Sequence, residues 1–587
     1  MSDLRRLRRL LPYLRRDRRR LLTALLLLLP LSGALAVQPL LVGQVISVLR
    51  GENAWGWLQA MNEATALQSL IGLLLAAVLF RLALQGSQSF LVQSIGQRLT
   101  ARLRVDLFRH SLDLSLRFHD RTPVGKLLTR LTSDVDALAE VFGSGAIGVL
   151  GDVVTLLVIA TLMLTVEWRL ALMLLLLQPP LAWLVITLQQ RYRKANYRVR
   201  EELGQLNADL QENLQGLEVV QMFRRERLNS ERFGTTNALY RRAVNGTIFF
   251  DSSISALLEW VSLAAVALVL AIGGSLVSAE AIGLGVLTTF ILYAQRLFDP
   301  LRQLAERFTQ IQGGLTAVER IGELLDEHQD IVDRGRSSTL QARGEVIFED
   351  VCFAYRPDEP ILQNLNLHIQ AGEHVALVGP TGSGKSTVIR LLCRLYEPQQ
   401  GRILLDGVDI RELPITTLRK RLGVVLQDTF LFSGSVADNL TLDSQRPRAE
   451  LEQICADLGL SPLLQQLPQG LDTTLRERGG NLSSGERQLL AVARVALRDP
   501  SVLVMDEATA FMDPSTEATL QRDLTRVLDR RTAIVIAHRL ATVEASDRIL
   551  VLKRGRLVEE GTHQELRRQG GLYAHLAELQ ERGLATL

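Results

Sequence analysis

Long apolar stretches dominate the first half of the chain. A helix that crosses a membrane needs about 20 mostly apolar residues, because the hydrocarbon layer is about 30 Å thick. Six stretches meet this requirement, and we expect a membrane helix in each of residues 20–49, 66–94, 144–166, 168–189, 247–275 and 281–306. In the fourth stretch, Pro179 and Pro180 predict a kink rather than an end.

Polar segments of helical pattern connect some of these stretches, and their charge predicts the orientation of the chain. The first twenty residues hold nine arginines, residues 98–144 hold eight Arg and Lys, and residues 190–246 hold eleven. Residues 51–65 and 273–283 hold none. Positive residues stay on the cytoplasmic side of membranes. We therefore expect a multi-pass protein of the cytoplasmic membrane, with the N-terminus, both long polar segments and the second half of the chain in the cytoplasm.

The arginine-rich start allows a second interpretation. Arginines followed by LLTALLLLLPLSGALA resemble a secretory signal peptide, with an A-x-A cleavage pattern at residues 34–36. The apolar run continues beyond that pattern, which favours a membrane helix instead. Leu4, Leu7, Leu11 and Leu14 alternate with the arginines and predict an amphipathic helix on the inner membrane surface.

From about residue 344 the pattern changes to the two-residue period of strands. Residues 345–355, EVIFEDVCFAY, alternate apolar and polar positions, and strand signals continue to the sequence HVALVG. That strand is followed by a G-x-x-x-x-G-K-[ST] phosphate loop and an apolar helix. The residues of the loop are Gly379, Pro380, Thr381, Gly382, Ser383, Gly384, Lys385, Ser386 and Thr387.

The chemistry of phosphate binding explains these residue types. Glycines let backbone N–H groups surround phosphate oxygens, and the N-terminus of the following helix adds partial positive charge. Lys385 is predicted to contact the β- and γ-phosphates, and Ser386 to bind Mg²⁺. A buried strand at residues 501–505 ends in Asp506 and Glu507. We expect one carboxylate to serve the metal and the other to orient or deprotonate the attacking water.

Composition supports a chain that is partly embedded in a membrane. Hydrophobic residues make up 47% of the 587 residues and the mean hydropathy is +0.15, which excludes a disordered or collagen-like chain. A net charge of +3 gives no argument for binding nucleic acid. Cys352, Cys393 and Cys455 are too few for a disulfide framework and are expected to be reduced thiols.

At this point the motifs resemble those of the ABC transporters. LSSGERQ at residues 482–488 is similar to the family's LSGGQ-type signature, AFMD at 510–513 to its D-loop, and IAHR at 536–539 to its H-loop. Gln427 matches the Q-loop, and Tyr355 stands where the adenine-stacking aromatic residue is expected. The resemblance covers the whole chain, and the first half is similar to the six-helix exporter type.

The resemblance implies a role for each matching residue. Tyr355 would stack on adenine, and Gln427 would contact Mg²⁺ and water. Ser483 and Gly485 would bind the γ-phosphate held by the opposite subunit. The implied catalytic residues are Glu507, His538 and Gln427, the implied metal ligands are Ser386, Gln427 and Asp506, and Asp513 would join the phosphate loop in binding ATP.

The resemblance also implies a fold and a division into domains. We expect an all-α six-helix transmembrane domain at residues 1–320 and a linker at 321–343. An α/β ABC ATPase domain of the P-loop NTPase class, with an antiparallel β subdomain, is expected at residues 344–587. Segments 117–136 and 210–226 look like the family's intracellular loops, which end in short coupling helices.

Because a signature contacts nucleotide on another subunit, the implied assembly is a dimer with two sandwiched ATP molecules. Export or flipping of amphipathic or hydrophobic small molecules or lipids is the leading hypothesis. Import of a siderophore or a cobalamin-like compound by the same fold is an alternative. A soluble ABC ATPase that acts on nucleic acid or ribosomes is a remote alternative, which the six apolar stretches oppose.

Two features leave the partner and the transport path open. The signature carries Ser484 and Glu486 where the family usually has glycine and glutamine, and the D-loop reads AFMD rather than SALD. Altered signatures occur in heterodimeric members, so both a homodimer and a heterodimer fit. Arg81, Asp152 and Glu259 fall in or near predicted spans, where they either form a polar patch, with Arg81 near Glu259, or pair structurally. The structural interpretation is favoured.

Overall fold

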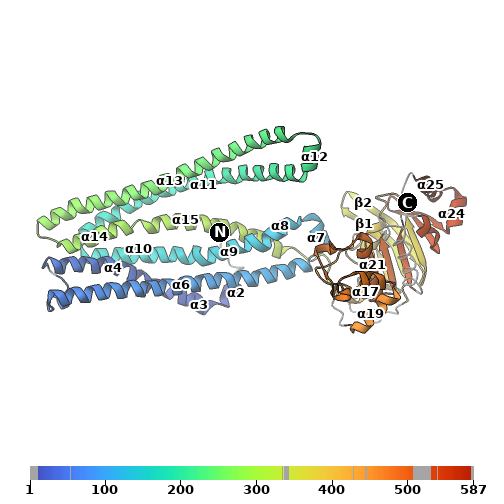
Figure 1. Ribbon diagram of the computed structural model, residues 1–587, viewed down its shortest axis with the longest axis horizontal. Coiled ribbons are helices and arrows are strands. Elements are labelled where there is room, and N and C mark those ends of the chain that lie inside the picture. Colours follow the sequence, from blue (N-terminus) through green and yellow to red (C-terminus); the bar gives the residue numbers. More distant parts are fainter. Residues whose placement is uncertain are drawn as a thin grey trace. The chain divides into compact units, whose positions relative to one another are not determined.

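The computed structural model describes residues 11–52, 54–333, 335, 343–427, 429–442, 446–506, 531–537 and 540–583, whose elements are drawn in Figure 1. The chain divides into two compact units. The first comprises residues 1–112 and 124–327, and the second comprises residues 113–123 and 328–587. Three predicted site residues, Glu507, Asp513 and His538, lie outside the described residues, as do Leu4 and Leu7 of the expected amphipathic helix.

The first unit is built of helices. They are α2 (Leu11–Arg15), α3 (Arg18–Leu26), α4 (Leu28–Leu49), α5 (Gly56–Gln59), α6 (Glu63–Asp113), α8 (Val124–Thr129), α9 (Val135–Glu140), α10 (Ala146–Val166), α11 (Trp168–Gln215), α12 (Leu217–Met222), α13 (Glu226–Ser278), α14 (Leu284–Arg296) and α15 (Asp299–Asp326). Two π-helical segments, η1 (Arg130–Asp134) and η2 (Val141–Gly145), lie between α8 and α10.

Five helical runs among the described residues are long and apolar enough to cross a membrane. They are Arg18–Leu49, Glu63–Asp113, Val124–Val166, Trp168–Gln215 and Glu226–Ser278. These runs contain the first five predicted stretches. Helix α11 continues through Pro179 and Pro180, so the two prolines do not end it, as predicted.

The sixth predicted stretch, 281–306, is not one continuous helix. Helix α14 ends at Arg296 and α15 begins at Asp299, so two consecutive helices form this stretch of the predicted six-helix domain. Pro300 stands in the first turn of α15. Proline lacks the backbone N–H that a helix interior requires, but it is well tolerated in a first turn, so a new helix begins here.

Helices α4 and α14 pack together through two glycines. A Cβ atom on Gly43 would lie 2.5 Å from the carbonyl oxygen of Gly285, and one on Gly285 would lie 2.3 Å from that of Gly43. Small residues allow such close contact between membrane helices. The buried Tyr293 hydroxyl donates a hydrogen bond to the carbonyl oxygen of Ala36 at 2.6 Å, and Glu52 accepts hydrogen bonds at the N-terminus of α14.

Helices α6, α11 and α13 extend far beyond a bilayer. Helix α6 has 51 residues, which at about 1.5 Å per residue gives about 75 Å, more than twice the hydrocarbon thickness. Helices α11 and α13 run along each other and are joined by the short α12, as Figure 1 shows. The polar segments were expected to be helical, and much of each one continues an apolar helix without a break.

The second unit contains the strands. They are β1 (Val346–Arg356), β2 (Glu359–Ile369), β3 (His374–Val378), β4 (Gln400–Leu405), β5 (Val408–Asp409), β6 (Leu422–Val425), β7 (Gly434–Ser435), β8 (Thr474–Leu475), β9 (Val502–Asp506), β10 (Thr532–Ile536), β11 (Arg548–Lys553) and β12 (Arg556–Gly561). The helices are α7 (Leu116–Arg121), α16 (Lys385–Leu392), α17 (Ile415–Arg421), α18 (Val436–Thr441), α19 (Arg448–Asp457), α20 (Ser461–Gln466), α21 (Ser484–Ala496), α23 (Leu540–Glu544), α24 (His563–Gln569) and α25 (Leu572–Glu581).

Two principal sheets organise this unit. A four-stranded antiparallel sheet has the order β2-β1-β4-β5. A six-stranded sheet has the order β12-β11-β3-β10-β9-β6, and only its edge strand β12 is antiparallel to its neighbour. The α/β domain with an antiparallel β subdomain predicted from the sequence is therefore confirmed.

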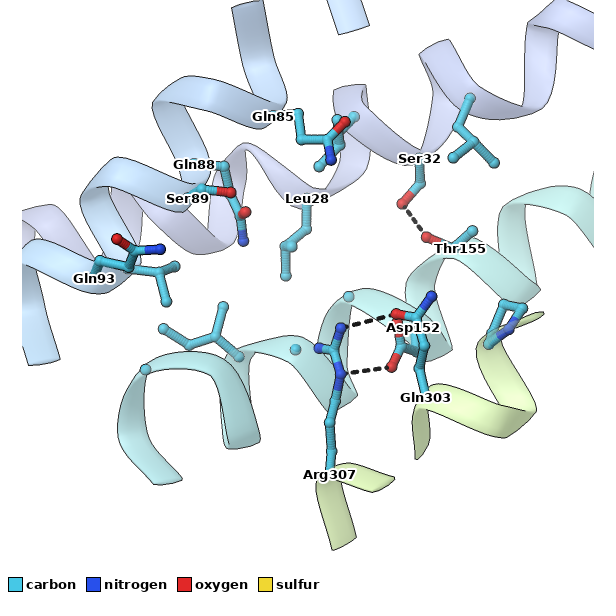
Figure 2. Close-up of a pocket in the computed structure, with 18 of the residues that line it drawn as sticks. Leu28, Ser32, Gln85, Gln88, Ser89, Gln93, Asp152, Thr155, Gln303 and Arg307 are labelled. Atoms are coloured by element: carbon cyan, nitrogen blue, oxygen red, sulfur yellow. Dashed lines mark hydrogen bonds and ion pairs between the residues drawn. The ribbon is translucent and has the colours of Figure 1, made fainter. Parts of the chain in front are cut away.

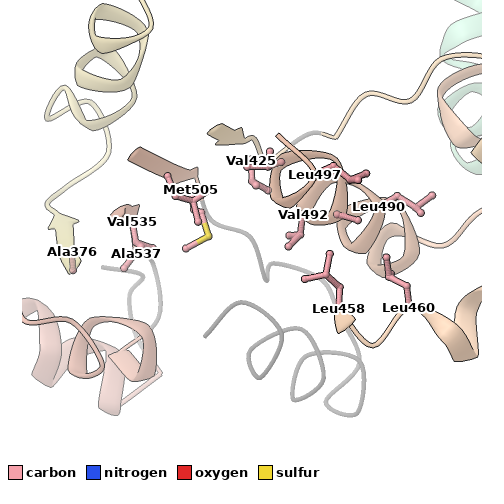
Figure 3. Close-up of a cluster of buried hydrophobic side chains, with 14 of the residues drawn as sticks. Ala376, Val425, Leu458, Leu460, Leu490, Val492, Leu497, Met505, Val535 and Ala537 are labelled. Atoms are coloured by element: carbon pink, nitrogen blue, oxygen red, sulfur yellow. The ribbon is translucent and has the colours of Figure 1, made fainter. Parts of the chain in front are cut away.

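The parallel strands are buried on both faces. In β9, Val502 and Val504 belong to one buried cluster, whereas Leu503 and Met505 belong to another on the opposite face. Alternate side chains of a strand point to opposite faces, so a continuous apolar run is what a doubly covered strand requires. Figure 3 shows one of these faces, where side chains of α21 lie toward Val425 and Met505.

Candidate functional site

The phosphate loop connects β3 to α16, as the sequence predicted. Gly379, Gly382 and Gly384 have φ angles of +148°, +80° and +106°. These values are costly for residues that carry a Cβ atom. A Cβ atom on Gly379 would also lie 2.2 Å from the carbonyl oxygen of Leu552, so the loop conformation and its contact with β11 both require glycine.

Polar groups of the loop are buried and turned inward. The ammonium of Lys385, 7% exposed, donates hydrogen bonds to the carbonyl oxygens of Gly379 and Pro380, the second at 3.3 Å. The side chain of Ser383 is buried, and its Oγ has no hydrogen-bond partner among the described residues. An unpartnered buried hydroxyl is costly. The Lys385 ammonium, which lies against its own loop, and the Ser383 hydroxyl are donors that suit a bound anion.

Ser386 and Asp506 come together although they are far apart in the sequence. Ser386 is in the first turn of α16 and Asp506 ends β9, and the serine hydroxyl donates a hydrogen bond to the aspartate Oδ2 at 3.5 Å. Hydroxyl and carboxylate oxygens are ligands that Mg²⁺ accepts. Two of the three predicted metal ligands are therefore adjacent and chemically suited to the ion.

Gln427 follows β6, and the sheet register places it on the side of the phosphate loop. Val425 of β6 pairs with Met505 of β9, and Asp506 pairs with Ile536 of β10, all in parallel. The carboxyl ends of parallel strands lie at one edge of a sheet, where open α/β sheets bind ligands. The carboxyl ends of β3, β6, β9 and β10 therefore lie at the same edge of the sheet.

The signature residues form the beginning of α21. Ser483 is its N-cap: its Oγ accepts a hydrogen bond from the Glu486 backbone N–H at 3.3 Å, and its own N–H donates to Glu486 Oε2 at 2.7 Å. This reciprocal arrangement is a capping box, and Gly485 is buried within the first turn. Glu486, which departs from the family pattern, therefore stabilises the helix start. The S-x-x-E spacing could have revealed this role from the sequence alone.

Tyr355 lies near the end of β1, against the helix of the phosphate loop. Its hydroxyl is 3.2 Å from Thr387 Oγ1, and it accepts a hydrogen bond from Arg390 at 3.3 Å. Its ring meets the rings of Phe353 and Tyr396 edge to face. The sequence predicted Tyr355 and Thr387 as site residues, but it gave no signal for Arg390 or Tyr396.

A separate cavity of about 830 Å³ lies among the helices of the first unit. Its wall carries many polar and charged side chains. Figure 2 shows Gln85, Gln88, Ser89 and Gln93 of α6 around the cavity, and Arg81 also lines it. Polar side chains within membrane segments face protein or water-filled space and mark transport paths.

Asp152 lines the same cavity and has a cationic partner that the sequence did not suggest. Arg307 Nε lies 3.3 Å from Asp152 Oδ2, and Arg307 Nη2 donates a hydrogen bond to Gln303 at 2.9 Å, as drawn in Figure 2. A Cβ atom on Gly148 would lie 1.4 Å from Arg307 Nη1, so glycine provides the space for the guanidinium. Arg81 lines this cavity, whereas Glu259 is exposed and does not line it.

Comparisons with known proteins agree with this arrangement. The model of the ABC transporter transmembrane region matches residues 21–301, and the ABC transporter model matches residues 362–510. A probable multidrug resistance ABC transporter ATP-binding/permease protein of Bacillus subtilis, YheH, is 37% identical over 519 residues, which cover 87% of this chain and 76% of that protein.

Two further relatives cover nearly the whole chain. An ATP-dependent lipid A-core flippase of Idiomarina loihiensis is 30% identical over 583 residues, 98% of each protein. The solved structure of a bacterial Atm1-family ABC exporter with ATP bound is 29% identical and has a TM-score of 0.78, covering 96% of this chain and 98% of that one. The membrane helices, the phosphate loop and these relatives lead to one conclusion: the chain belongs to the ABC transporters, as an exporter-type half-transporter with one membrane domain fused to one ABC ATPase domain.

Proposed function

We propose that this half-transporter couples hydrolysis of Mg²⁺–ATP to the export, or flipping, of amphipathic small molecules or lipids across the cytoplasmic membrane. Its ATPase domain is of the kind that is coupled to transport. The names of its relatives, a multidrug transporter and a lipid A-core flippase, support a substrate with an apolar part.

The observation that carries the proposal is the hydrogen bond between Ser386 and Asp506 next to the phosphate loop, whose glycines have positive φ angles. In this proposal the backbone N–H groups of the loop and Lys385 hold the phosphates, and Ser386, Asp506 and Gln427 hold Mg²⁺. The ion, when bound, offsets the negative charge that develops on the phosphates. Glu507 orients or deprotonates the attacking water, and His538 contacts the γ-phosphate.

The polar cavity supports an amphipathic rather than a purely apolar substrate. Glutamine and serine side chains of α6 offer donors and acceptors, and Asp152 is already paired with Arg307. A polar head group could take hydrogen bonds from these side chains, while exposed apolar side chains on the same helix, such as Leu79 and Phe80, suit lipid chains.

Exporter half-transporters function as dimers, and we propose that this one pairs with a second copy of itself. Each chain has both halves of a composite site, the phosphate loop and a signature that contains Ser483 and Gly485. Glu486 forms a regular cap of the signature helix, so the unusual residue gives no reason to regard the signature as degenerate. ATPase activity of the purified chain alone would support the homodimer, whereas activity only with a second half-transporter would support the heterodimer.

Transport in sealed inside-out membrane vesicles tests the function and its direction. The vesicles expose the predicted cytoplasmic face, and an amphipathic fluorescent dye reports movement. We expect accumulation of the dye that needs ATP and Mg²⁺ and that the Glu507→Gln variant does not support. ATP-dependent depletion would indicate import instead, and ATP turnover that no tested amphiphile stimulates, with no movement of dye, would contradict the proposal.

A further inference from the structure

Helix α7 belongs to the same compact unit as the strands, although it follows the membrane-spanning α6 in the sequence. Leu116 packs against the apolar cluster that contains Phe353 and Tyr396. Ser115, the N-cap residue of α7, donates a hydrogen bond to Asp330 at 3.0 Å. The helix is therefore held in the second unit by both apolar and polar contacts.

The principal polar contact of α7 is made by Asp120. Tyr396 donates its hydroxyl hydrogen to Asp120 Oδ2, and Arg390 lies 3.9 Å from the same oxygen. Burial, together with this hydrogen bond, raises the pKa of Tyr396, so the hydroxyl stays protonated and remains a donor. Asp120 is thus held by one neutral and one cationic partner.

Arg390 connects Asp120 to the predicted adenine-stacking residue. It belongs to α16, the helix of the phosphate loop, and its Nη1 donates to the Tyr355 hydroxyl at 3.3 Å. Its guanidinium also lies 5.8 Å from the centre of the Tyr355 ring, within the range of a cation–π contact. One side chain therefore touches both the tyrosine and the carboxylate of α7.

The Tyr355 ring is fixed from several directions. The ring centres of Phe353 and Tyr396 lie 4.9 Å and 5.1 Å away, both at an interplanar angle of 87°. Arg121 of α7 donates a hydrogen bond to the Tyr355 carbonyl oxygen at 3.4 Å. A small cavity of about 230 Å³ adjoins this cluster, lined by Tyr355, Asp120, Arg390 and three further arginines.

We propose that Arg390 is a positioning residue that presents the Tyr355 ring to the adenine base and links the occupancy of that ring to the seating of α7 through Asp120. The inference rests on the proposed function, in which Tyr355 stacks on adenine. A ring held in place loses little freedom when a base stacks on it. Coupling is reciprocal, so a base that stabilises the Tyr355–Arg390 pair also stabilises α7 on the domain.

The test compares ATP with inorganic tripolyphosphate, which has phosphates but no base. In the full-length transporter in lipid nanodiscs, Arg390→Gln should raise the KM for ATP about tenfold, the size expected from losing one hydrogen bond and one cation–π contact. The kcat and the inhibition constant of tripolyphosphate should change less than twofold. Asp120→Asn should raise the KM by a smaller factor, and the double variant should resemble Arg390→Gln alone.

A control variant and an independent readout separate positioning from folding. Arg356→Gln alters an exposed arginine of the same cavity and should leave the KM unchanged. Hydrogen exchange in residues 113–123 should slow on addition of ATP in the wild type, but not in Arg390→Gln and not with tripolyphosphate. Partial loss of folded protein would lower the maximal rate without changing the ratio of the KM for ATP to the inhibition constant of tripolyphosphate.

The outcomes distinguish this inference from the proposed function. Equal changes in the KM for ATP and the inhibition constant of tripolyphosphate, or no change in either, would overturn the role of Arg390. So would unchanged protection of residues 113–123 by ATP in Arg390→Gln. Absence of ATP turnover in the wild-type protein would instead refute the proposed function. Normal turnover in the wild type would leave the proposed function intact. If Arg390→Gln then left the ratio of the KM for ATP to the inhibition constant of tripolyphosphate unaltered, only the link through Arg390 would be refuted.

Discussion

Neutralising Asp152 tests whether the ion pair in the membrane domain is structural. Asp152→Asn leaves the cavity shape almost unchanged and removes one charge from a pair separated by 3.3 Å. At an effective dielectric constant of about 20, two unit charges at this distance attract each other by about 5 kcal/mol. Arg307 keeps its hydrogen bond to Gln303 and its side chain is 24% exposed, which lowers the expected net cost to about 2–3 kcal/mol.

A matched double variant separates loss of the pair from loss of an unrelated contact. Asp152→Asn with Arg307→Gln removes both charges of the pair, so neither partner is left without the charge that offsets it. Replacing both members of a buried ion pair often changes the stability of the fold little, whereas removing one partner lowers the stability strongly. We expect the double variant to recover most of the stability lost in the single variant.

The assay is thermal unfolding of the full-length transporter in lipid nanodiscs, followed by intrinsic fluorescence. Asp152→Asn should lower the midpoint by several degrees, and the double variant should unfold close to the wild type. A single variant as stable as the wild type would refute the structural role of the pair. A double variant no more stable than the single variant would show that the lost stability does not come from the pairing of Asp152 with Arg307.

Three further predictions concern the ATPase domain. Glu507→Gln should bind ATP but arrest turnover, because the residue proposed to activate water is lost; hydrolysis at the normal rate would show that the catalytic assignment is wrong. Glu486→Ala should cost about 1 kcal/mol of stability, measured by thermal unfolding, because the capping box is lost, and Glu486→Gln should cost less. Maleimide at neutral pH should label Cys352 in the native protein, and Cys393 and Cys455 only after unfolding, because burial raises the pKa of the Cys393 thiol to about 12 and that of the Cys455 thiol to about 11. Rapid labelling of Cys455 in the native protein, detected by mass spectrometry, would refute this.

Local patterns explain why much of the fold could be predicted. The phosphate loop is a short segment whose glycines, lysine and serine have fixed spacing, and the structure places it between a strand and a helix as expected. The strand that ends at Asp506 was visible as a short apolar run, and the polar segments that follow the membrane helices were visible as helical patterns. The break near Pro300 was missed because the apolar run around it satisfied the length expected of a span.

Contacts between distant residues could not be predicted. Asp152 was visible as a charge in an apolar stretch, but only the packing of α10 and α15 brings Arg307 to it. Asp120, Arg390 and Tyr355 come from three separate segments, and no spacing in the sequence relates them. The roles of Glu507, Asp513 and His538 stay predictions, because these residues lie outside the part of the chain that the structure describes.

The claim that the rest depends on is that each ATP site is completed by the signature of the other subunit. Two inactive variants test it directly: Lys385→Ala disables the phosphate loop, and Ser483→Arg blocks the signature. In a mixed dimer, one site combines both defects, while the other combines an intact loop with an intact signature. We predict that co-expression restores ATP turnover that neither variant has alone. If the mixture stays inactive although the two chains assemble, the signature does not act across the dimer and the account is contradicted.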